Sequence, residues 1–312
     1  MGLVLAGISA FEYWRHHDGP IDLRRNAPTG FLTAKGRREY RPCSIELAEL
    51  PQRGFASLSE PLHLMVPDPS MRLRSQPVVW HACSSAIPRE ELYEAVHGVY
   101  VASPRLSLIQ LADDASLPRI AKAAFELCGS YRLCPEGRFA KAQPLVSPEA
   151  LRALPKPLNA VGGSVLLRRA ARYVLSGSAS PAESALAILL CFPSEFGGYG
   201  FSLPRLNDRI DIGRVGWGLT GKSYFKPDMY WPEAKLAVEY DSKQFHSSPE
   251  KLAADAARRN VLLHKGIEVV TVSADQLMNA ARFDETAGII GRKLGKRMRY
   301  RGKDVMGKRY RL

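Results

Sequence analysis

Residues 225–246 read FKPDMYWPEAKLAVEYDSKQFH, and the second half of this stretch decides the fold of the region around it. Polar and apolar residues alternate from residue 236 onward, which predicts a β-strand whose successive side chains point to opposite faces. One face of the predicted strand carries Glu239, Asp241 and Lys243. The opposite face carries Leu236, Val238 and Tyr240.

Two acids on one face of a strand repel each other unless a positive charge lies between them. A divalent metal bound by oxygen ligands supplies that charge, and a nearby lysine or histidine can handle protons. Glu239 and Asp241 are therefore candidate metal ligands, with Lys243 and His246 close by in the sequence. The alternative is an amphipathic edge strand whose polar face is solvated.

A further acid lies upstream, where Ser180-Pro181-Ala182-Glu183 precedes an apolar run over residues 184–190. Ser is a favourable N-cap, Pro suits the first helical position and an acid at the third position completes a capping box. These residues predict a helix. Glu183 has two interpretations that the sequence leaves open: it completes the capping box, or it projects toward the strands as a metal ligand.

Residues 251–265, KLAADAARRNVLLHK, predict a downstream helix with an apolar stripe. Gly266 ends this helix, residues 267–272 predict a buried strand, and Ser273 begins another short helix. Arg258 and Arg259 lie near the polar side of the helix and are candidate phosphate contacts. The alternative is a solvated face with an ion pair between residues three or four apart.

The segment between residue 183 and Asp228 is rich in glycine. It predicts two strands linked by a loop over residues 213–221, and the second strand ends at Asp228. Trp217 and Tyr224 are expected to pack in the interior.

The order of these motifs resembles a known family. Pro227-Asp228 is followed after twelve residues by Asp241-Ser242-Lys243, with a histidine beyond, a helix containing Asp-x-x-Arg-Arg, a glycine and a strand. The succession is similar to bacterial relatives of the very-short-patch-repair (Vsr) endonucleases, within the PD-(D/E)xK nuclease superfamily. The resemblance covers roughly residues 180–295 and is most specific over residues 226–246.

The resemblance implies a restriction-endonuclease-like α/β domain that binds Mg²⁺ or Mn²⁺ and cleaves DNA. It implies metal ligation by Asp228, Glu239 and Asp241, and a general-acid or phosphate-facing role for His246. The chain departs from the family pattern at Ser242, where relatives usually have glycine. Many relatives also lack a lysine at the position of Lys243.

The charge balance favours a polyanionic partner. The 312 residues include 44 Lys or Arg against 31 Asp or Glu, a formal net charge of +13. Lys and Arg that contact phosphates release counterions, so such an excess suits nucleic acid. Ten of the basic residues lie between residues 292 and 311, and Lys296, Arg297 and Arg299 are candidate contacts. The alternative is a solubilising basic tail.

Other classes of protein are disfavoured by composition. No apolar run reaches the length of a membrane span, and the amino terminus lacks the positive region of a signal peptide, so a cytoplasmic protein is expected. The five cysteines form no Cys-x-x-Cys pair, which argues against a structural zinc site and a disulfide framework.

The amino-terminal half predicts a smaller α/β domain over residues 61–145, after an irregular segment over residues 1–60. Strands are expected over residues 61–66, 76–81 and 98–102, and helices over residues 88–96, 104–111 and 117–127. The V-x-H strand and the step VYVASPR at residues 99–105 resemble AbiEi-type antitoxin-like regulators. This resemblance implies DNA binding and a toxin or defence-system partner.

A helical connector is expected over residues 146–179, with Ser147 as a cap and a second helix over residues 162–175. Arg168 and Arg172 share one face of that helix and are candidate nucleic-acid contacts.

The sequence thus predicts a metal-dependent DNA endonuclease. The competing interpretations are a non-catalytic DNA-binding regulator or antitoxin that keeps the nuclease fold, and a defence-system interaction protein that binds RNA or a protein partner.

Overall fold

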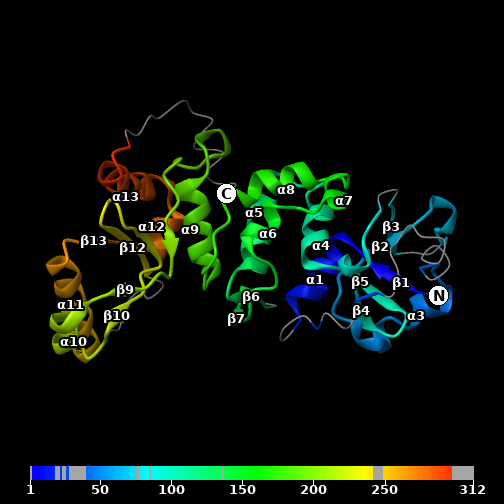
Figure 1. Cartoon of the computed structure of the whole chain (residues 1–312), viewed down its shortest axis with the longest axis horizontal. Helices are drawn as coiled ribbons and strands as arrows, with labels where there is room; N and C mark the ends of the chain where they lie inside the picture. Colours follow the sequence, from blue (N-terminus) through cyan, green and yellow to red (C-terminus); the bar gives the residue numbers. More distant parts are fainter. Residues whose placement is uncertain are drawn as a thin grey trace. The chain divides into compact units, whose positions relative to one another are not determined.

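The computed structural model describes the chain over residues 2–17, 22, 26–27, 40–74, 77–83, 86–134, 137–241 and 249–296. These residues form two compact units, Met1–Val174 (unit 1) and Leu175–Leu312 (unit 2) (Figure 1). The boundary falls within the stretch 146–179 for which the sequence predicts a connector. Each unit has its own sheet and its own helices, so the predicted α/β class is confirmed.

Unit 1 is built on a five-stranded sheet with the order β3-β2-β1-β5-β4. The strands are β1 (Leu3–Leu5), β2 (Leu62–Val66), β3 (Val78–Ala82), β4 (Leu92–Val96) and β5 (Val99–Ala102). The central strand β1 is fully buried, and it pairs antiparallel with β2 and parallel with β5. Residues 3–5 therefore belong to the core of unit 1, in contrast to the irregular segment predicted over residues 1–60.

Helices surround this sheet and extend unit 1. They are α1 (Gly7–Arg15), α3 (Ser44–Glu49), α4 (Pro104–Leu111), α5 (Leu117–Cys128), α6 (Pro148–Arg152), α7 (Lys156–Asn159) and α8 (Ser164–Ala171). The predicted Ser147 cap is confirmed, because its hydroxyl accepts a backbone N–H bond in the first turn of α6, and the hydroxyl of Ser103 does the same at α4. Helix α8 packs on α5 and α6, which places most of the predicted connector inside unit 1.

One predicted helix of unit 1 is wrong. Residues 88–96 form a 3-10 turn (Arg89–Glu91) followed by the strand β4. Pro88 followed by acids is typical of a helix start, but Leu92 lies opposite Ala102 in an antiparallel pair with β5. Pairing with a buried neighbouring strand prevails here over the local helix signal. A separate antiparallel pair is formed by β6 (Tyr131–Leu133) and β7 (Phe139–Lys141).

Unit 2 contains a four-stranded mixed sheet with the order β13-β12-β11-β8. The strands are β8 (Arg205–Leu206), β11 (Met229–Trp231), β12 (Leu236–Asp241) and β13 (Glu268–Ser273). β12 is antiparallel to β11 and parallel to β13, and the connection to β13 runs through helix α11 (Pro249–His264). A two-stranded antiparallel pair, β9 (Ile210–Asp211) and β10 (Tyr224–Phe225), lies next to it in sequence.

The remaining helices of unit 2 are α9 (Pro181–Cys191), α10 (Gly213–Thr220), α12 (Ala274–Met278) and α13 (Ala280–Lys293). The hydroxyl of Ser180 accepts the N–H of Glu183, as the sequence predicts for an N-cap. Ser273 and Gln276 form a capping box at the start of α12. The loop predicted over residues 213–221 is instead the helix α10, and the expected packing of Trp217 and Tyr224 is wrong because both side chains are exposed.

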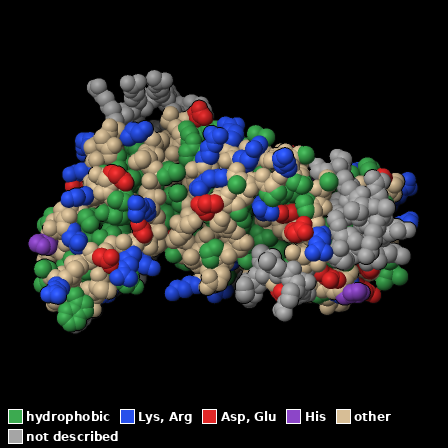
Figure 2. All heavy atoms as spheres, viewed as in Figure 1, with side chains coloured by type: hydrophobic (Ala, Val, Ile, Leu, Met, Phe, Trp, Pro, Cys, Tyr) green, Lys and Arg blue, Asp and Glu red, His purple; other side chains and the backbone are tan. Residues whose placement is uncertain are grey.

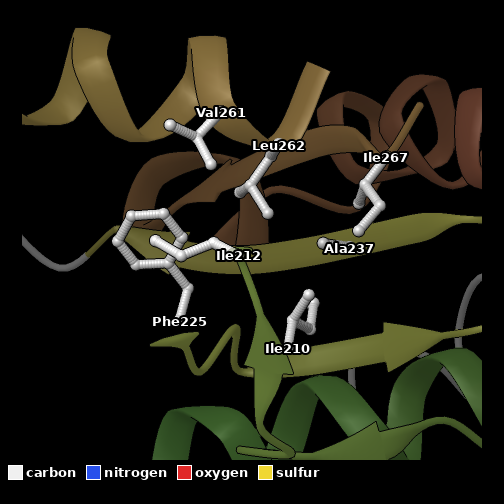
Figure 3. Close-up of a cluster of buried hydrophobic side chains, with 7 residues drawn as sticks. All are labelled: Ile210, Ile212, Phe225, Ala237, Val261, Leu262 and Ile267. Carbon is white, nitrogen blue, oxygen red and sulfur yellow. The ribbon is translucent and has the colours of Figure 1, made fainter. Parts of the chain in front are cut away.

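A buried cluster holds the β9–β10 pair against the sheet and α11. Figure 3 shows Val261 and Leu262 of α11 pointing toward Ala237 of β12, with Ile212 and Phe225 beside them. On this side of β12 the apolar residue Ala237 is followed by Glu239, so the acidic end of the strand begins next to the buried cluster. In the described residues no helix combines the length and the apolar character of a membrane span.

Candidate metal centre

The two acids Asp228 and Glu239 come together at the end of the unit 2 sheet. Met229 of β11 lies opposite Val238 of β12 in an antiparallel pair. Continuing this register by one residue brings Asp228, which precedes β11, opposite Glu239. The backbone N–H of Tyr240 donates to Asp228 Oδ2 at 2.7 Å, which fixes the aspartate against β12.

Helix α11 supplies the positive charge at this site. Arg258 donates through Nη2 to Glu239 Oε1 and forms an ion pair in which both side chains are mostly buried. Its guanidinium carbon lies 5.2 Å from the centre of the Phe225 ring, so the arginine packs on a residue of the apolar cluster. Arg258, a candidate phosphate contact in the sequence, is therefore engaged with a carboxylate of the site.

Burial leaves the two carboxyl groups poorly solvated. Desolvation raises the pKa of Asp228, while the Tyr240 N–H and the Arg258 charge act against that rise. Desolvation likewise raises the pKa of Glu239, Arg258 opposes the rise, and the charges of Asp228 and Asp255 add to it. One arginine thus faces an excess of negative charge, an arrangement that favours an additional cation.

Glu183 lies at the start of α9, where its carboxylate accepts hydrogen bonds from its neighbours but does not complete the predicted capping box. Its Oε2 accepts the N–H of Ala179 at 2.9 Å and the side-chain N–H of Asn207 at 2.7 Å. Its Oε1 accepts the hydroxyl of Ser180 at 3.0 Å. Burial and the charge of Asp228 raise the pKa of Glu183. These three donors hold the carboxylate at the start of α9, and its metal ligation stays a prediction from the sequence.

Asn207 is a site residue that sequence reasoning missed. Its backbone N–H donates to the carbonyl of Asp228 at 3.2 Å, and its amide donates to Glu183 and to the carbonyl of Gly177 at 3.0 Å. The residue adopts a left-handed conformation (φ 50°) immediately after β8. Asn tolerates this conformation better than most residues, which is the only signal that the sequence offers for it.

The other predicted site residues are dispersed. Asp241 is exposed at the last position of β12, where it pairs in register with Ser273. Arg259 and Lys296 are exposed on unit 2, whereas Arg168 and Arg172 lie at the end of α8 in unit 1. The remaining predicted residues lie outside the described ranges, and they are Lys243, His246, Arg297 and Arg299.

The described side chains suit a metal that needs few protein ligands. Among them no three His, Cys, Asp or Glu residues gather closely enough to hold an ion. Mg²⁺, however, usually keeps several waters and binds through one or two carboxylates together with substrate phosphates. Asp228 Oδ1 and Glu239 Oε2 accept no hydrogen bond from the described residues, so this pair offers two oxygens that fit such a metal.

Four carboxylates are predicted from the sequence as metal ligands. In the part of the chain that the structure describes, Asp228 and Glu239 are the two that lie opposite each other on paired strands.

Comparison of the chain with models of known protein families, with curated proteins and with solved structures finds no match to any of them.

Proposed function

We propose that this protein is a metal-dependent phosphodiesterase that cleaves DNA at the Asp228–Glu239 pair. The observation that carries the proposal is the position of two desolvated carboxylates on neighbouring strands, each with one oxygen that accepts no hydrogen bond from the described residues. The net charge of +13 supports a polyanionic substrate.

The arrangement of unit 2 supports the finer assignment to the restriction-endonuclease type. In that fold a mixed sheet flanked by helices carries acids at the ends of adjacent strands. Unit 2 has a mixed sheet, a helix that connects its parallel strands, and Asp228 and Glu239 at one end of an antiparallel pair. The motif spacing in residues 226–246 supports the same assignment.

A divalent cation at this pair would polarise the scissile phosphate and lower the pKa of a bound water. The Tyr240 N–H holds Asp228 through Oδ2, which leaves Oδ1 available to a cation. Arg258 forms an ion pair with Glu239. If the glutamate instead bound the cation, Arg258 would be free to pair with a phosphate of the substrate. Proton transfer by Lys243 or His246 stays a prediction from the sequence.

The test compares Asp228→Asn with a matched change of another acid, Glu268→Gln, which lies on the same unit in an exposed ion pair with Lys293. We expect Asp228→Asn to abolish Mg²⁺-dependent nicking of supercoiled plasmid and to remove Mn²⁺ binding measured by electron paramagnetic resonance. The Glu268→Gln variant should keep both. Mn²⁺ binding and nicking that survive in Asp228→Asn would refute the proposal.

A second function is favoured by one observation, the ion pair between Arg258 and Glu239. An arginine that permanently neutralises Glu239 would make unit 2 a non-catalytic DNA-binding regulator. In that case wild-type protein should retard duplex DNA on a gel in the presence of Mg²⁺ and leave it uncut. It should also bind no Mn²⁺.

A further inference from the structure

The pair β9–β10 and the helix α10 between them form a projecting surface element, residues 209–226, which we call the α10 hairpin. Its base is anchored in unit 2, because Ile210, Ile212 and Phe225 are buried in the cluster of Figure 3. Gly216 also packs closely, since a Cβ there would lie 2.6 Å from Cβ of Ile212. The element is therefore fixed at its base while most of α10 faces solvent.

The exposed part of the α10 hairpin carries large apolar side chains that a solvated helix would not need. Trp217 is 63% exposed, Leu219 59%, Val215 55% and Tyr224 39%. Figure 2 shows hydrophobic side chains at the surface on the α10 end of unit 2, flanked by Lys and Arg. Exposed aromatic rings of this size are able to stack on unpaired bases.

Two cations lie close to one of these aromatic rings, that of Tyr224. The guanidinium of Arg209 lies 4.5 Å from the centre of the Tyr224 ring, and Nζ of Lys226 lies 5.8 Å from it. Arg214 and Lys222 are exposed and form no ion pair with the described acids. Residues 205–226 contain five basic residues against two acids, an excess of three positive charges. The surface thus pairs flat rings with groups that contact phosphates.

The geometry of α10 disfavours a lipid surface or a partner helix. At 3.6 residues per turn, Trp217 points about 200° away from Val215 around the helix axis, whereas Leu219 lies within about 40° of Val215. The apolar side chains therefore occupy two sides of the helix. A membrane or a partner helix requires one continuous apolar stripe.

The α10 hairpin leads directly into the carboxylate pair. The strand β10 ends at Phe225, whose ring supports Arg258, and Lys226 and Pro227 are followed by Asp228. A strand of nucleic acid held on the hairpin would therefore approach Asp228 and Glu239.

These observations point to one occupant. We infer that the α10 hairpin is a stacking platform for unpaired bases of single-stranded DNA, with Trp217 and Tyr224 as the rings and Arg214, Lys222 and Lys226 at the phosphates. Aromatic rings combined with a basic track are the means by which proteins bind single strands. This inference deepens the proposed function and rests on it for the identity of the polymer.

The experiment measures binding of full-length protein to a fluorescently labelled single-stranded DNA oligonucleotide by anisotropy, in the presence of a chelator. We expect Trp217→Ala to weaken binding about tenfold, the loss typical of one stacked base. Trp217→Phe keeps a ring and should stay within about threefold of wild type. Phe139→Ala removes a 50% exposed aromatic side chain of unit 1 and serves as the control that leaves affinity unchanged.

A charge variant tests the phosphate contacts separately. Lys222→Gln should reduce the magnitude of the negative slope of log affinity against log salt by about 0.7, the value for one phosphate contact on a single strand. An unchanged slope would remove Lys222 from the platform.

The outcomes separate this inference from the proposed function, because binding is measured without metal. If Trp217→Ala binds single strands like wild type while Asp228→Asn has lost nicking, the inference fails and the function stands. If Trp217→Ala weakens binding while Asp228→Asn still nicks, the platform stands and the function fails.

Four other results would overturn the inference. They are equal weakening on duplex DNA, tighter binding of RNA of the same sequence, Trp217-dependent sedimentation with anionic phospholipid vesicles, and a monomer–dimer equilibrium that Trp217→Ala abolishes.

Discussion

At the scale of single residues, the charge and ion pairing of Glu239 decide whether the carboxylate could bind a metal. Arg258 neutralises it, burial disfavours its charge, and Asp228 and Asp255 repel it. The same carboxylate pairs with Arg258 and, under the proposed function, would also be the ligand of an added cation. Its chemistry depends on which positive charge it faces.

Removing Arg258 tests this balance. The side chains of Arg258 and Glu239 are 28% and 23% exposed, so we expect Arg258→Met to lower the free energy of unfolding by about 1–3 kcal/mol, between the values for exposed and fully buried pairs. The pKa of Glu239 should rise further, so the loss is largest at neutral pH and shrinks as acid protonates the glutamate. Urea denaturation at several pH values measures this effect.

Two further variants control for packing. Adding Glu239→Gln to Arg258→Met removes the unpaired charge and should recover part of the loss. Arg209→Met breaks an ion pair whose side chains are 56% and 73% exposed, and it should cost less than about 1 kcal/mol. Equal losses for Arg258→Met and Arg209→Met would contradict the role of the buried pair.

The partnership of Glu239 with Arg258 was beyond what the sequence could predict. Strand periodicity placed Glu239 on a polar face, and helical periodicity placed Arg258 on a polar side. The rotation of α11 about its own axis relative to β12 is set by the packing of Val261 and Leu262 on Ala237, which no local pattern specifies. The Ser180 cap, in contrast, depends on neighbours within one turn, and the sequence predicted it.

At the scale of elements, α10 shows why glycine content is a misleading guide to the secondary structure of this segment. Glycine lowers helix propensity, so four glycines within residues 213–221 predict a loop. In the structure Gly213 and Gly221 adopt left-handed conformations at the two ends of the helix, with φ of 66° and 65°. Gly216 allows the helix to approach Ile212. The glycines therefore delimit and seat the helix, and tertiary packing offsets their low propensity.

Two alanine substitutions within α10 should have opposite effects. No atom lies within 4 Å of the place that a Cβ on Gly218 would take, so Gly218→Ala should stabilise unit 2 by about 0.5–1 kcal/mol. Gly216→Ala would bring its Cβ to 2.6 Å from Cβ of Ile212 and should destabilise by about 1–3 kcal/mol. Thermal unfolding of both variants checks the pair. A stabilising Gly216→Ala would show that α10 is not seated on Ile212.

At the scale of the whole molecule, burial of three acids links the stability of the folded protein to pH. The pKa values of Glu183, Asp228 and Glu239 are all raised in the folded protein. The folded state therefore holds protons at a pH where the unfolded chain has released them. The contribution of these groups to stability is present in acid and declines as pH rises from about 4 through the folded pKa values.

A divalent cation should reverse that decline. We expect Mg²⁺ to raise the melting temperature of the full chain at neutral pH, where Asp228 and Glu239 are charged, and to have little effect near about pH 4, where they bind protons. Asp228→Asn should remove the Mg²⁺ effect and raise stability at neutral pH without metal. Equal Mg²⁺ stabilisation in that variant would place the metal elsewhere.

Asn207 ties the first residues of unit 2 to the strand that carries Asp228, through the carbonyl of Gly177 on one side and that of Asp228 on the other. A displacement of Gly177 would therefore reach Asp228 through one residue, because the side-chain amide of Asn207 donates to Gly177 and its backbone N–H donates to Asp228.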